Sequence, residues 1–497
     1  MQATRRQFLK GTLAAAATAV LPSAGALAAP RAKAAKANDE IRLAMVGLGG
    51  PGGVGGRGRQ LLSRLEHVAG VRVVALCDVD RGILDRGVQQ FNDRQRPVKA
   101  YTDLREVLDD KEIDAVALAI PNHWHALATV WACRAGKDVY VEKPVSYNIW
   151  EGRQMVAAAR KHGRIVQAGT QGRSSPPLQQ AFEFIRSGQI GPALYAHAVN
   201  YKRRPSIGKV DGPQPVPSTV DYNLWRGPAP MEPLMRENLH YDWHWVWATG
   251  NGEMGNNGVH YIDMCRWALG YDGLAPRAMS IGGRFGYDDD GQTPNTQVAI
   301  LDYTPAPILC EIRGLPSKAG ADSMDKFRTV DKGILIQCEE GYFAGGHVGG
   351  AVFDNSGGQI KEFRGVEFSE LAVRHLENFA QAVRSRNAQS LGADIREGHV
   401  SAAGCHMANV SHLLGAQATP QRIMEVTKAN SQLSDAFERC RDHLRANGVD
   451  IGKTPAVLGP WVTMDSDQQK FVGEFSDRAN KLSKRVYRKP FVVPDIA

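Results

Sequence analysis

The chain has 497 residues, enough for two or three domains, and its 43% apolar and 23% charged residues are typical of a soluble globular protein. The net charge is +8, but beyond the N-terminus no basic block with interleaved aromatic residues occurs, which argues against a nucleic-acid-binding protein. Seven cysteines are scattered singly without a C-x-x-C pair, so we expect neither a disulfide framework nor a metal site.

The N-terminus has the pattern of an export signal. Thr4–Lys10 reads Thr-Arg-Arg-Gln-Phe-Leu-Lys, which matches the twin-arginine pattern, and an Ala-rich stretch with a small-x-small site at Ala26–Ala28 follows. Pro22 and Gly25 interrupt this stretch, which disfavours a membrane span. We predict a signal peptide over 1–29, a linker over 30–40, transport by the twin-arginine translocase and a periplasmic location. The signal is either cleaved or kept as a tether.

A glycine-rich turn between a strand and a helix comes next. The apolar run Ile41–Val46 predicts a buried strand, and a helical pattern resumes after an apparent insertion over 51–56. Glycines in such a turn let the backbone approach a pyrophosphate closely, and the following helix N-terminus faces the phosphate charge. This pattern favours a dinucleotide site with the candidate residues Gly47, Gly49, Gly50, Arg57 and Gly58.

The second predicted strand, Val71–Cys77, ends on an acid, Asp78. A carboxylate in this place can bind the adenosine ribose hydroxyls and would repel a 2′-phosphate, so Asp78 favours NAD over NADP. Arg81 softens that preference, and NADP stays open. The alternative for Asp78 is a plain turn or helix-capping residue.

Two further buried strands are predicted at Ala115–Ile120 and Asp138–Val141, and helical stretches alternate with all of these strands. This alternation predicts an α/β fold whose N-terminal domain, over 41–168, is a Rossmann doubly wound parallel sheet. Ligands of such sheets bind at the C-terminal ends of the strands. Pro121–His125 and Glu142–Pro144 both follow a strand, and so we expect them at the site.

Glu142–Pro144, Pro121–His125 and Gly169–Arg173 together resemble the motifs of the Gfo/Idh/MocA family of oxidoreductases. The resemblance extends from about residue 41 to the low 400s. It implies a nicotinamide cofactor and places Lys143 near the nicotinamide and the reacting hydroxyl, where a lysine can stabilise an alkoxide or act as a base. The alternative for Lys143 is a surface lysine in a turn. The cofactor contacts that the resemblance implies come from Pro121, Asn122, His123, His125, Glu142, Lys143 and Gln171.

A helix predicted over 256–267 places Asn256, His260 and Asp263 on one face. The resemblance makes His260 the acid/base, and a hydrogen-bonded structural histidine is the alternative. Many sugar dehydrogenases of the family have Asp where this chain has Asn256, so Asp263 or Glu253 would supply the carboxylate. The candidate catalytic residues are therefore Lys143, Asn256, His260 and Asp263.

The stretch before this helix is rich in aromatic residues. Sugars present apolar C–H faces to aromatic rings and need fixed polar partners for their hydroxyls. These aromatics either line a carbohydrate pocket or fill the domain core, and Lys202 either binds an anionic sugar or ends a strand in solvent. The candidate substrate-binding residues are Arg173, Lys202, Trp225, Trp245 and Trp247.

Short alternating runs over 277–353 predict a sheet in the second domain. We expect an α+β domain over 169–420 with an open, mainly antiparallel sheet. The resemblance implies that the open face joins subunits of a homo-oligomer. Residues 421–497 form a C-terminal extension to which the sequence assigns no chemistry.

The leading hypothesis is a periplasmic NAD(P)-dependent oxidoreductase that transfers hydride between a ring carbon of a sugar and its cofactor. Because twin-arginine substrates are exported folded and the periplasm has little free nicotinamide cofactor, the enzyme would retain its cofactor. Two alternatives remain: an NAD-dependent glycosidase or lyase that works by transient oxidation and elimination, and a non-catalytic sugar- or cofactor-binding protein.

Overall fold

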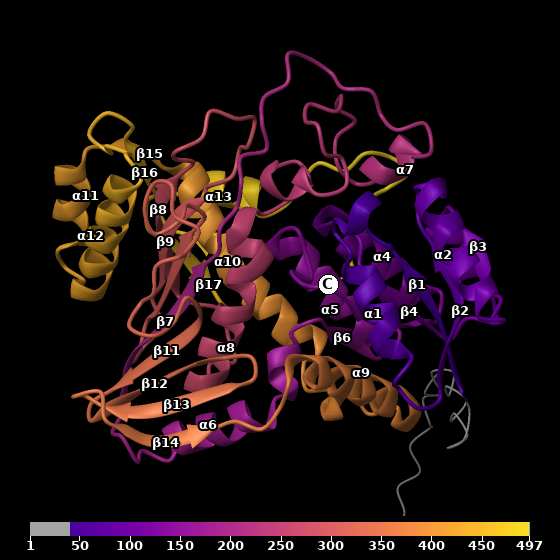
Figure 1. Ribbon diagram of the computed structural model, residues 1–497, viewed down its shortest axis with the longest axis horizontal. Coiled ribbons are helices and arrows are strands. Elements are labelled where there is room, and N and C mark those ends of the chain that lie inside the picture. Colours follow the sequence, from indigo (N-terminus) through magenta and orange to yellow (C-terminus); the bar gives the residue numbers. More distant parts are fainter. Residues whose placement is uncertain (1–39, 497) are drawn as a thin grey trace, which may run out of the picture. The chain divides into compact units, whose positions relative to one another are not determined.

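The computed structural model describes residues 40–496 (Figure 1). The predicted signal peptide over 1–29 and nearly all of the predicted linker lie outside the described residues. Within the described range, no helix combines the length and the apolar character that crossing a membrane requires. All seven cysteines fall inside this range, and each is a buried free thiol.

The first sheet is parallel throughout and has the strand order β3-β2-β1-β4-β5-β6 (Figure 1), which confirms the predicted doubly wound sheet. Helices cover it on both faces, so strands β4 and β5 are buried along their whole length. Its strands are β1 (Ile41–Val46), β2 (Val71–Cys77), β3 (Lys99–Tyr101), β4 (Ala115–Leu118), β5 (Asp138–Val141) and β6 (Val166–Ala168). Its helices are α1 (Arg57–Leu65), α2 (Arg81–Asp93), α3 (Leu104–Asp109), α4 (Asn122–Arg134) and α5 (Ile149–Lys161).

The second sheet has twelve strands, and only β7 and β10 pair in parallel, so the predicted mainly antiparallel sheet is confirmed. Its central order is β14-β13-β12-β11-β7-β10-β9-β8-β16-β15. The first eight strands are β7 (Ala193–Tyr201), β8 (Arg277–Gly283), β9 (Thr296–Leu301), β10 (Ile308–Arg313), β11 (Lys332–Cys338), β12 (Gly341–Gly346), β13 (Gly349–Asp354) and β14 (Gln359–Phe363). Four short strands follow: β15 (Ala416–Ala418), β16 (Ala456–Leu458), β17 (Val462–Asp465) and β18 (Lys470–Val472).

Helices lie against both sides of this sheet. One face packs on α6 (Pro176–Arg186), α8 (Val259–Leu269) and α10 (Ile395–Leu414) in the largest apolar core. On the other face, Leu433 and Phe437 of α12 (Ser431–Ala446) pack against strand residues such as Ile300, and α11 (Pro420–Thr427) lies beside α12. The part of the sheet that was expected to be open is therefore covered near β8, β9 and β10 by the C-terminal extension.

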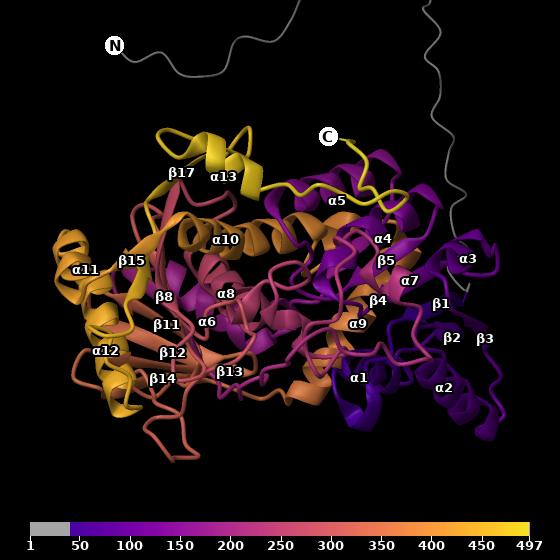
Figure 2. The same cartoon turned by 90° about the horizontal axis from the view of Figure 1, so that it is seen from above.

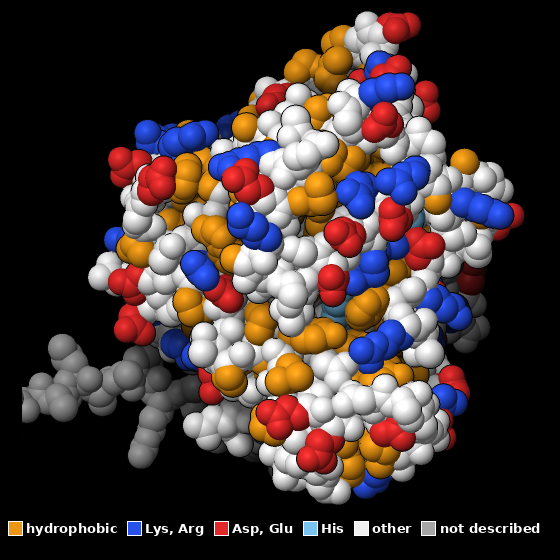
Figure 3. Space-filling view, turned by 90° about the vertical axis from the view of Figure 1, so that its left-hand side faces the viewer, with side chains coloured by type: hydrophobic (Ala, Val, Ile, Leu, Met, Phe, Trp, Pro, Cys, Tyr) orange, Lys and Arg blue, Asp and Glu red, His pale blue; other side chains and the backbone are white. Residues whose placement is uncertain are grey.

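The surface on the α11–α12 side carries both signs of charge. Figure 3 shows basic and acidic side chains interspersed there with apolar groups, without a large area of one sign. Local pairs such as Arg422–Glu425, at 2.8 Å, contribute to this mixture. Such a surface provides no extended field for a polyanion.

Residues 202–250 form a long connection between β7 and α8, which we call the roof segment. It contains α7 (Tyr222–Arg226) and a 3-10 turn at Asp242–Trp245. Backbone hydrogen bonds from Asp221 N to Val79 O and from Arg81 N to Thr219 O, both 2.9 Å, fasten it to the end of β2. The roof segment thus lies over the C-terminal edge of the parallel sheet.

The last residues, 483–496, form a tail that follows α13 (Ser476–Leu482) and runs along α5 toward α7 (Figure 2). Phe491 is buried between the rings of Trp124 and Trp131 on α4. Arg488 donates hydrogen bonds to Asn223 Oδ1 at 2.7 Å and to Asn223 O at 2.9 Å. The tail therefore connects the first domain with the roof segment.

Candidate functional site

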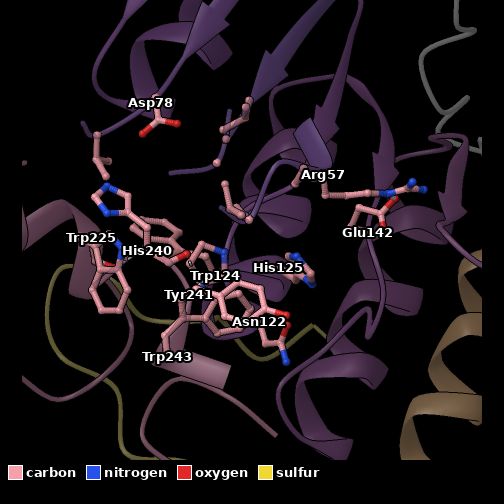
Figure 4. Close-up of a pocket in the computed structure, with 18 of the residues that line it drawn as sticks. Arg57, Asp78, Asn122, Trp124, His125, Glu142, Trp225, His240, Tyr241 and Trp243 are labelled. Carbon is pink, nitrogen blue, oxygen red and sulfur yellow. Dashed lines mark hydrogen bonds and ion pairs between the residues drawn. The ribbon is translucent and has the colours of Figure 1, made fainter. Parts of the chain in front are cut away.

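A cavity of about 410 Å³ opens at the C-terminal ends of β1, β2, β4 and β5, beneath the roof segment (Figure 4). The first domain supplies the glycine turn, Asp78 and the loops after β4 and β5, and the roof segment supplies aromatic side chains. Of the residues predicted for the site, those that line the cavity are Gly47, Gly49, Arg57, Asp78, Pro121, Asn122, His125, Glu142, Lys143, Lys202, Trp225 and Asn256.

The glycine turn brings backbone close to backbone. A Cβ at Gly47, whose φ is +86°, would lie 2.5 Å from Ala119 O, and a Cβ on Gly58 would collide with Gly47 O. Gly58 is thus the glycine that allows α1 to pack against the turn. Gly50 faces His240 of the roof segment and does not line the cavity.

Asp78 lies at the end of β2, at one side of the cavity (Figure 4). Its oxygens accept hydrogen bonds from Leu48 N at 2.8 Å and Asp80 N at 3.0 Å. Burial raises the pKa of Asp78 to about 6, so the group is a carboxylate at neutral pH. The neighbouring Asp80 carboxylate lies 2.8 Å from His240 Nε2, which ties the roof segment to the same strand end.

Buried Glu142 and partly exposed Arg57 form an ion pair on the other side of the cavity (Figure 4). Arg57 Nε lies 2.7 Å from Glu142 Oε1, and only 5% of the Glu142 side chain is exposed. Gln171 does not line the cavity; it donates to Tyr140 Oη at 3.1 Å behind this pair. Glu142 therefore holds the first residue of α1 in place at the end of β5.

His125 presents an acceptor beside the cavity. Its Nδ1 lies 2.6 Å from Pro144 O, and because a carbonyl only accepts, Nδ1 carries the proton. Nε2 is buried and makes no side-chain hydrogen bond among the described residues, and burial lowers the pKa of this imidazole while the Pro144 and Ile120 carbonyls oppose the shift. Asn122 donates to Asn251 Oδ1 at 3.0 Å, whereas His123 lies outside the cavity wall against Trp225 O and Thr249 O.

Lys143 is half-buried and has no carboxylate in direct contact within residues 40–496. Its Nζ donates to Asn256 O at 2.6 Å and lies 3.3 Å from Asn256 Oδ1. Burial lowers the pKa of Lys143 to about 8, with Glu142 and Glu253 opposing this shift and Arg57 and Arg204 adding to it. A substantial fraction of this amine is neutral slightly above neutral pH, so it can serve either as a proton donor or as an acceptor.

A buried carboxylate stands behind Asn256. Asn256 Nδ2 donates to Glu253 Oε2 at 3.1 Å, and Arg204 pairs with both Glu253 oxygens at 2.9 Å. Although burial opposes ionisation, Arg204 and the amide donors hold the pKa of Glu253 below its ordinary value. Arg204 also donates to Tyr241 Oη at 2.8 Å. A continuous series of hydrogen bonds therefore connects Lys143, through Asn256 and Glu253, with the roof segment.

His260 lies one turn after Asn256 and is half-buried, although it is not part of the cavity lining. Burial and then the charge of Lys143 hold the pKa of His260 well below its ordinary value. Its nearest ring is that of His347, with centroids 4.9 Å apart and planes at 77°. The structure thus joins Lys143 to Asn256 and places His260 one turn further along the chain, outside the cavity lining.

Asp263 and Arg173 lie elsewhere. Arg173 Nε lies 2.9 Å from Asp263 Oδ2, and Ser401 Oγ donates to the same carboxylate at 2.6 Å. Arg266 and Glu397 complete this network, in which the Asp263 side chain is 1% exposed. The Asp263 carboxylate is bonded to Arg173 and Ser401 in this buried network. Neither Asp263 nor Arg173 lines the cavity.

The aromatic candidates divide in the same way. Trp225 lines the cavity, whereas Trp245 is buried near Arg204, and Trp247 lies near His412, 6.5 Å between ring centroids. Trp124 of α4, within the predicted segment Pro121–His125, also lines the cavity, as do His240, Tyr241 and Trp243 of the roof segment. Three of these belonged to the aromatic-rich stretch, whose composition indicated the region but not the individual residues.

Comparisons with known proteins agree with this geometry. Residues 41–170 match the model of the oxidoreductase family, NAD-binding Rossmann fold, and residues 197–297 match the model of the oxidoreductase family, C-terminal alpha/beta domain. Residues 2–22 match the model of the twin-arginine translocation pathway signal sequence.

Among curated relatives, inositol 2-dehydrogenase of Salmonella typhimurium is 30% identical over 174 residues, 35% of this chain and 51% of that protein. Glycosyl hydrolase family 109 protein 1 of Shewanella sp. (strain MR-4) is 30% identical over 211 residues, 39% of this chain and 45% of that protein. The chain therefore spans about half the length of the curated relatives it matches.

Solved structures share the fold at low identity. The aldose-aldose oxidoreductase of Caulobacter crescentus, complexed with glycerol, has a TM-score of 0.53 and 16% identity over 73% of this chain and 94% of that chain. The WlbA dehydrogenase of Bordetella pertussis, in complex with NADH and UDP-GlcNAcA, has a TM-score of 0.51 and 18% identity over 74% of this chain and 95% of that chain.

Proposed function

Because the chain belongs to the Gfo/Idh/MocA family of NAD-binding oxidoreductases and carries a twin-arginine signal, we propose that it is an exported enzyme that transfers hydride between a carbohydrate CH–OH group and a resident NAD. The observation that carries this proposal is the position of Lys143. This half-buried amine with a lowered pKa lies in the wall of the dinucleotide cavity and is bonded to the helix that bears His260.

The residues of the cavity fit a nicotinamide dinucleotide. Gly47 and Gly58 have no room for a side chain, which keeps the turn tight and packed against α1, and Gly49 lines the cavity where the backbone would face a pyrophosphate. The carboxylate of Asp78 supplies acceptors for ribose hydroxyls and disfavours a 2′-phosphate, which supports NAD rather than NADP. His125 Nε2, buried and without a side-chain hydrogen bond among the described residues, offers one more acceptor beside the same cavity.

Bound nicotinamide would supply the hydride acceptor, and the chain would manage the proton of the substrate hydroxyl. In its neutral form Lys143 Nζ can take this proton, and in its charged form it stabilises the oxygen from which the proton leaves. Asn256 orients Nζ through two oxygens, and Glu253 fixes the Asn256 amide. His260, kept neutral by burial, is the second group able to exchange a proton.

Carbohydrate is the substrate class that the roof segment supports best. Trp225, Tyr241 and Trp243 give the cavity aromatic surface, and Lys202, Asn257 and the pair of Lys143 and Asn256 add polar groups. Apolar rings with a few fixed polar groups suit the C–H faces and hydroxyls of a sugar. The dehydrogenase relatives named above act on inositol and aldoses by name, which is consistent with this class.

The contacts that hold the roof segment over the cavity support retention of the cofactor. The roof segment is fastened to β2 by backbone hydrogen bonds and by His240, and the tail fastens it again through Arg488. Exit of a dinucleotide would require several of these contacts to open together. Retention of the cofactor outside the cytoplasm favours a redox-neutral cycle, in which one sugar carbon is oxidised and another is later reduced.

The first test is to denature the purified exported protein and to quantify the nicotinamide that is released. Near-stoichiometric NAD, together with its reduction in the native protein by a sugar, supports the proposal. Lys143→Met should keep the NAD and lose its reduction, whereas the exposed Lys470→Met should keep both. A wild-type protein that is empty and does not bind added NAD would contradict the proposal.

A second candidate keeps the same first step. The similarity to glycosyl hydrolase family 109 proteins favours an enzyme that oxidises a ring hydroxyl, eliminates a glycosidic substituent and returns the hydride. Product analysis with an aryl glycoside separates the two candidates. A released aglycone without net NADH supports the hydrolase, and a ketosugar with an intact aglycone supports the oxidoreductase.

A further inference from the structure

The turn between β12 and β13 brings a histidine to the helix that bears His260. The register of this hairpin pairs Gly346 with Gly349, so His347 and Val348 form its two-residue tip. Val348 is exposed, whereas His347 is half-buried, with its ring centroid 4.9 Å from that of His260 and 5.7 Å from that of Tyr261. One residue of the tip therefore faces solvent and the other contacts α8.

The glycines around this tip allow the hairpin to lie so close. A Cβ on Gly349, whose φ is +126°, would collide with Phe363 O, and a Cβ on Gly350 would lie 2.7 Å from the Phe343 ring. Side chains at these positions would push the tip away from its neighbours. The ring of Phe368, 5.7 Å from that of His347, closes another side.

Neither imidazole has a hydrogen bond or an ion pair within residues 40–496. Their contact is edge to face, with ring planes at 77°, the geometry that aromatic rings prefer. Without a hydrogen bond to fix it, the orientation of the His260 ring depends on the rings around it. The edge-to-face contact with His347 is one such contact.

We propose that His347 is a positioning residue for His260: its ring holds the His260 imidazole in the orientation that exchanges a proton with the substrate hydroxyl. This inference rests on the proposed function. The inference gives the second sheet a role in the reaction, because its β12–β13 hairpin would hold the side chain of His260 on α8.

The test uses the holoenzyme with its resident nicotinamide and, as the probe, whichever of inositol, glucose and glucuronate reduces the bound cofactor of the wild type fastest. The variants are His347→Ala, His347→Phe and the matched control Val348→Ala at the exposed position of the same tip. NAD content and the melting temperature are measured for each, so that loss of fold or of cofactor is detected separately.

We expect His347→Ala to lower kcat about 10- to 100-fold with KM changed less than about threefold, because a misplaced proton-transfer group slows chemistry more than binding. His347→Phe restores the edge-to-face ring contact and should recover at least about half of the wild-type kcat. Val348→Ala should match the wild type.

Three results would overturn the inference: His347→Ala equal to Val348→Ala, an effect confined to KM, or a His347→Phe variant as slow as His347→Ala. The failure of the proposed function looks different. In that case the wild-type protein itself would hold no NAD, or none of the three probes would reduce it.

Discussion

Phe491 and Trp124 stand edge to face, with ring centroids 5.5 Å apart, although 366 positions separate them in the sequence. Trp124 lines the cavity from the first turn of α4, and Phe491 belongs to the tail. The same tail bonds through Arg488 to Asn223 of the roof segment. The tail therefore connects a residue that lines the cavity, Trp124, with the roof segment.

The first prediction concerns this connection. Arg488→Ala removes charged hydrogen bonds worth about 1.5 kcal/mol, which corresponds to roughly tenfold faster release of NAD. Dialysis followed by quantification of the retained nicotinamide measures this rate. Val486→Ala is the matched control, because Val486 is 92% exposed in the same tail. Equal retention by both variants would show that the tail does not hold the roof segment.

The second prediction concerns pH and Lys143. The pKa of this amine is lowered to about 8, so sugar oxidation that uses the neutral amine should slow as the pH falls below about 8. The rate of reduction of bound NAD, recorded between pH 6 and about 9.5, gives the profile. Lys143→Arg keeps the charge, loses the limb near pH 8 and should be slower by about 100-fold or more. An unchanged limb in this variant would assign it to another group.

The third prediction concerns the choice of cofactor. Asp78→Asn keeps the shape but loses the charge that repels a 2′-phosphate, so the affinity ratio of NADP to NAD should rise about tenfold. Because the pKa of Asp78 is raised to about 6, NAD affinity of the wild type should weaken as the pH falls through 6, and the variant should not show this dependence. Equilibrium binding of both dinucleotides to cofactor-stripped protein measures both effects.

The fourth prediction separates stability from chemistry at Asp263. Replacing it by Asn leaves Arg173 and Arg266 facing a neutral amide in a buried network, at a cost of about 3–5 kcal/mol of unfolding free energy. Denaturant unfolding measures this loss, and Asp272→Asn at an exposed position should be neutral. Single-turnover reduction of bound NAD in the folded Asp263→Asn protein should stay within about threefold of the wild type. A loss comparable to that of Lys143→Met would place Asp263 in the reaction.

The local patterns were sufficient to predict the first domain. A strand, a glycine turn and a helix form one contiguous unit, and Asp78 and Lys143 follow their strands directly, so the topology of a parallel sheet places them at one edge. Local patterns did not predict the geometry at the start of the helix that bears His260. A π-helical turn at Met254–Gly258 precedes α8 and changes the angular relation between Asn256 and the residues that follow it.

The features of the site that the sequence did not predict depend on contacts between residues far apart in the chain. Nothing near Asp263 in the sequence indicates that Arg173 and Ser401 will satisfy its charge. His347 lies in a glycine-rich hairpin whose place beside α8 depends on the order of strands in the second sheet. The roof residues that line the cavity alternate with others that pack inward, and composition alone does not separate Tyr241 from Trp245.

The seven buried thiols acquire a meaning when the export signal is considered with them. Burial raises the pKa values of Cys77, Cys265 and Cys405 well above the ordinary thiol value, and thiolates are the species that oxidants and disulfides attack. A chain exported in its folded state would meet an oxidising compartment with all seven thiols already buried. Folding before export would therefore protect these thiols from oxidation by burial alone, without a disulfide among them.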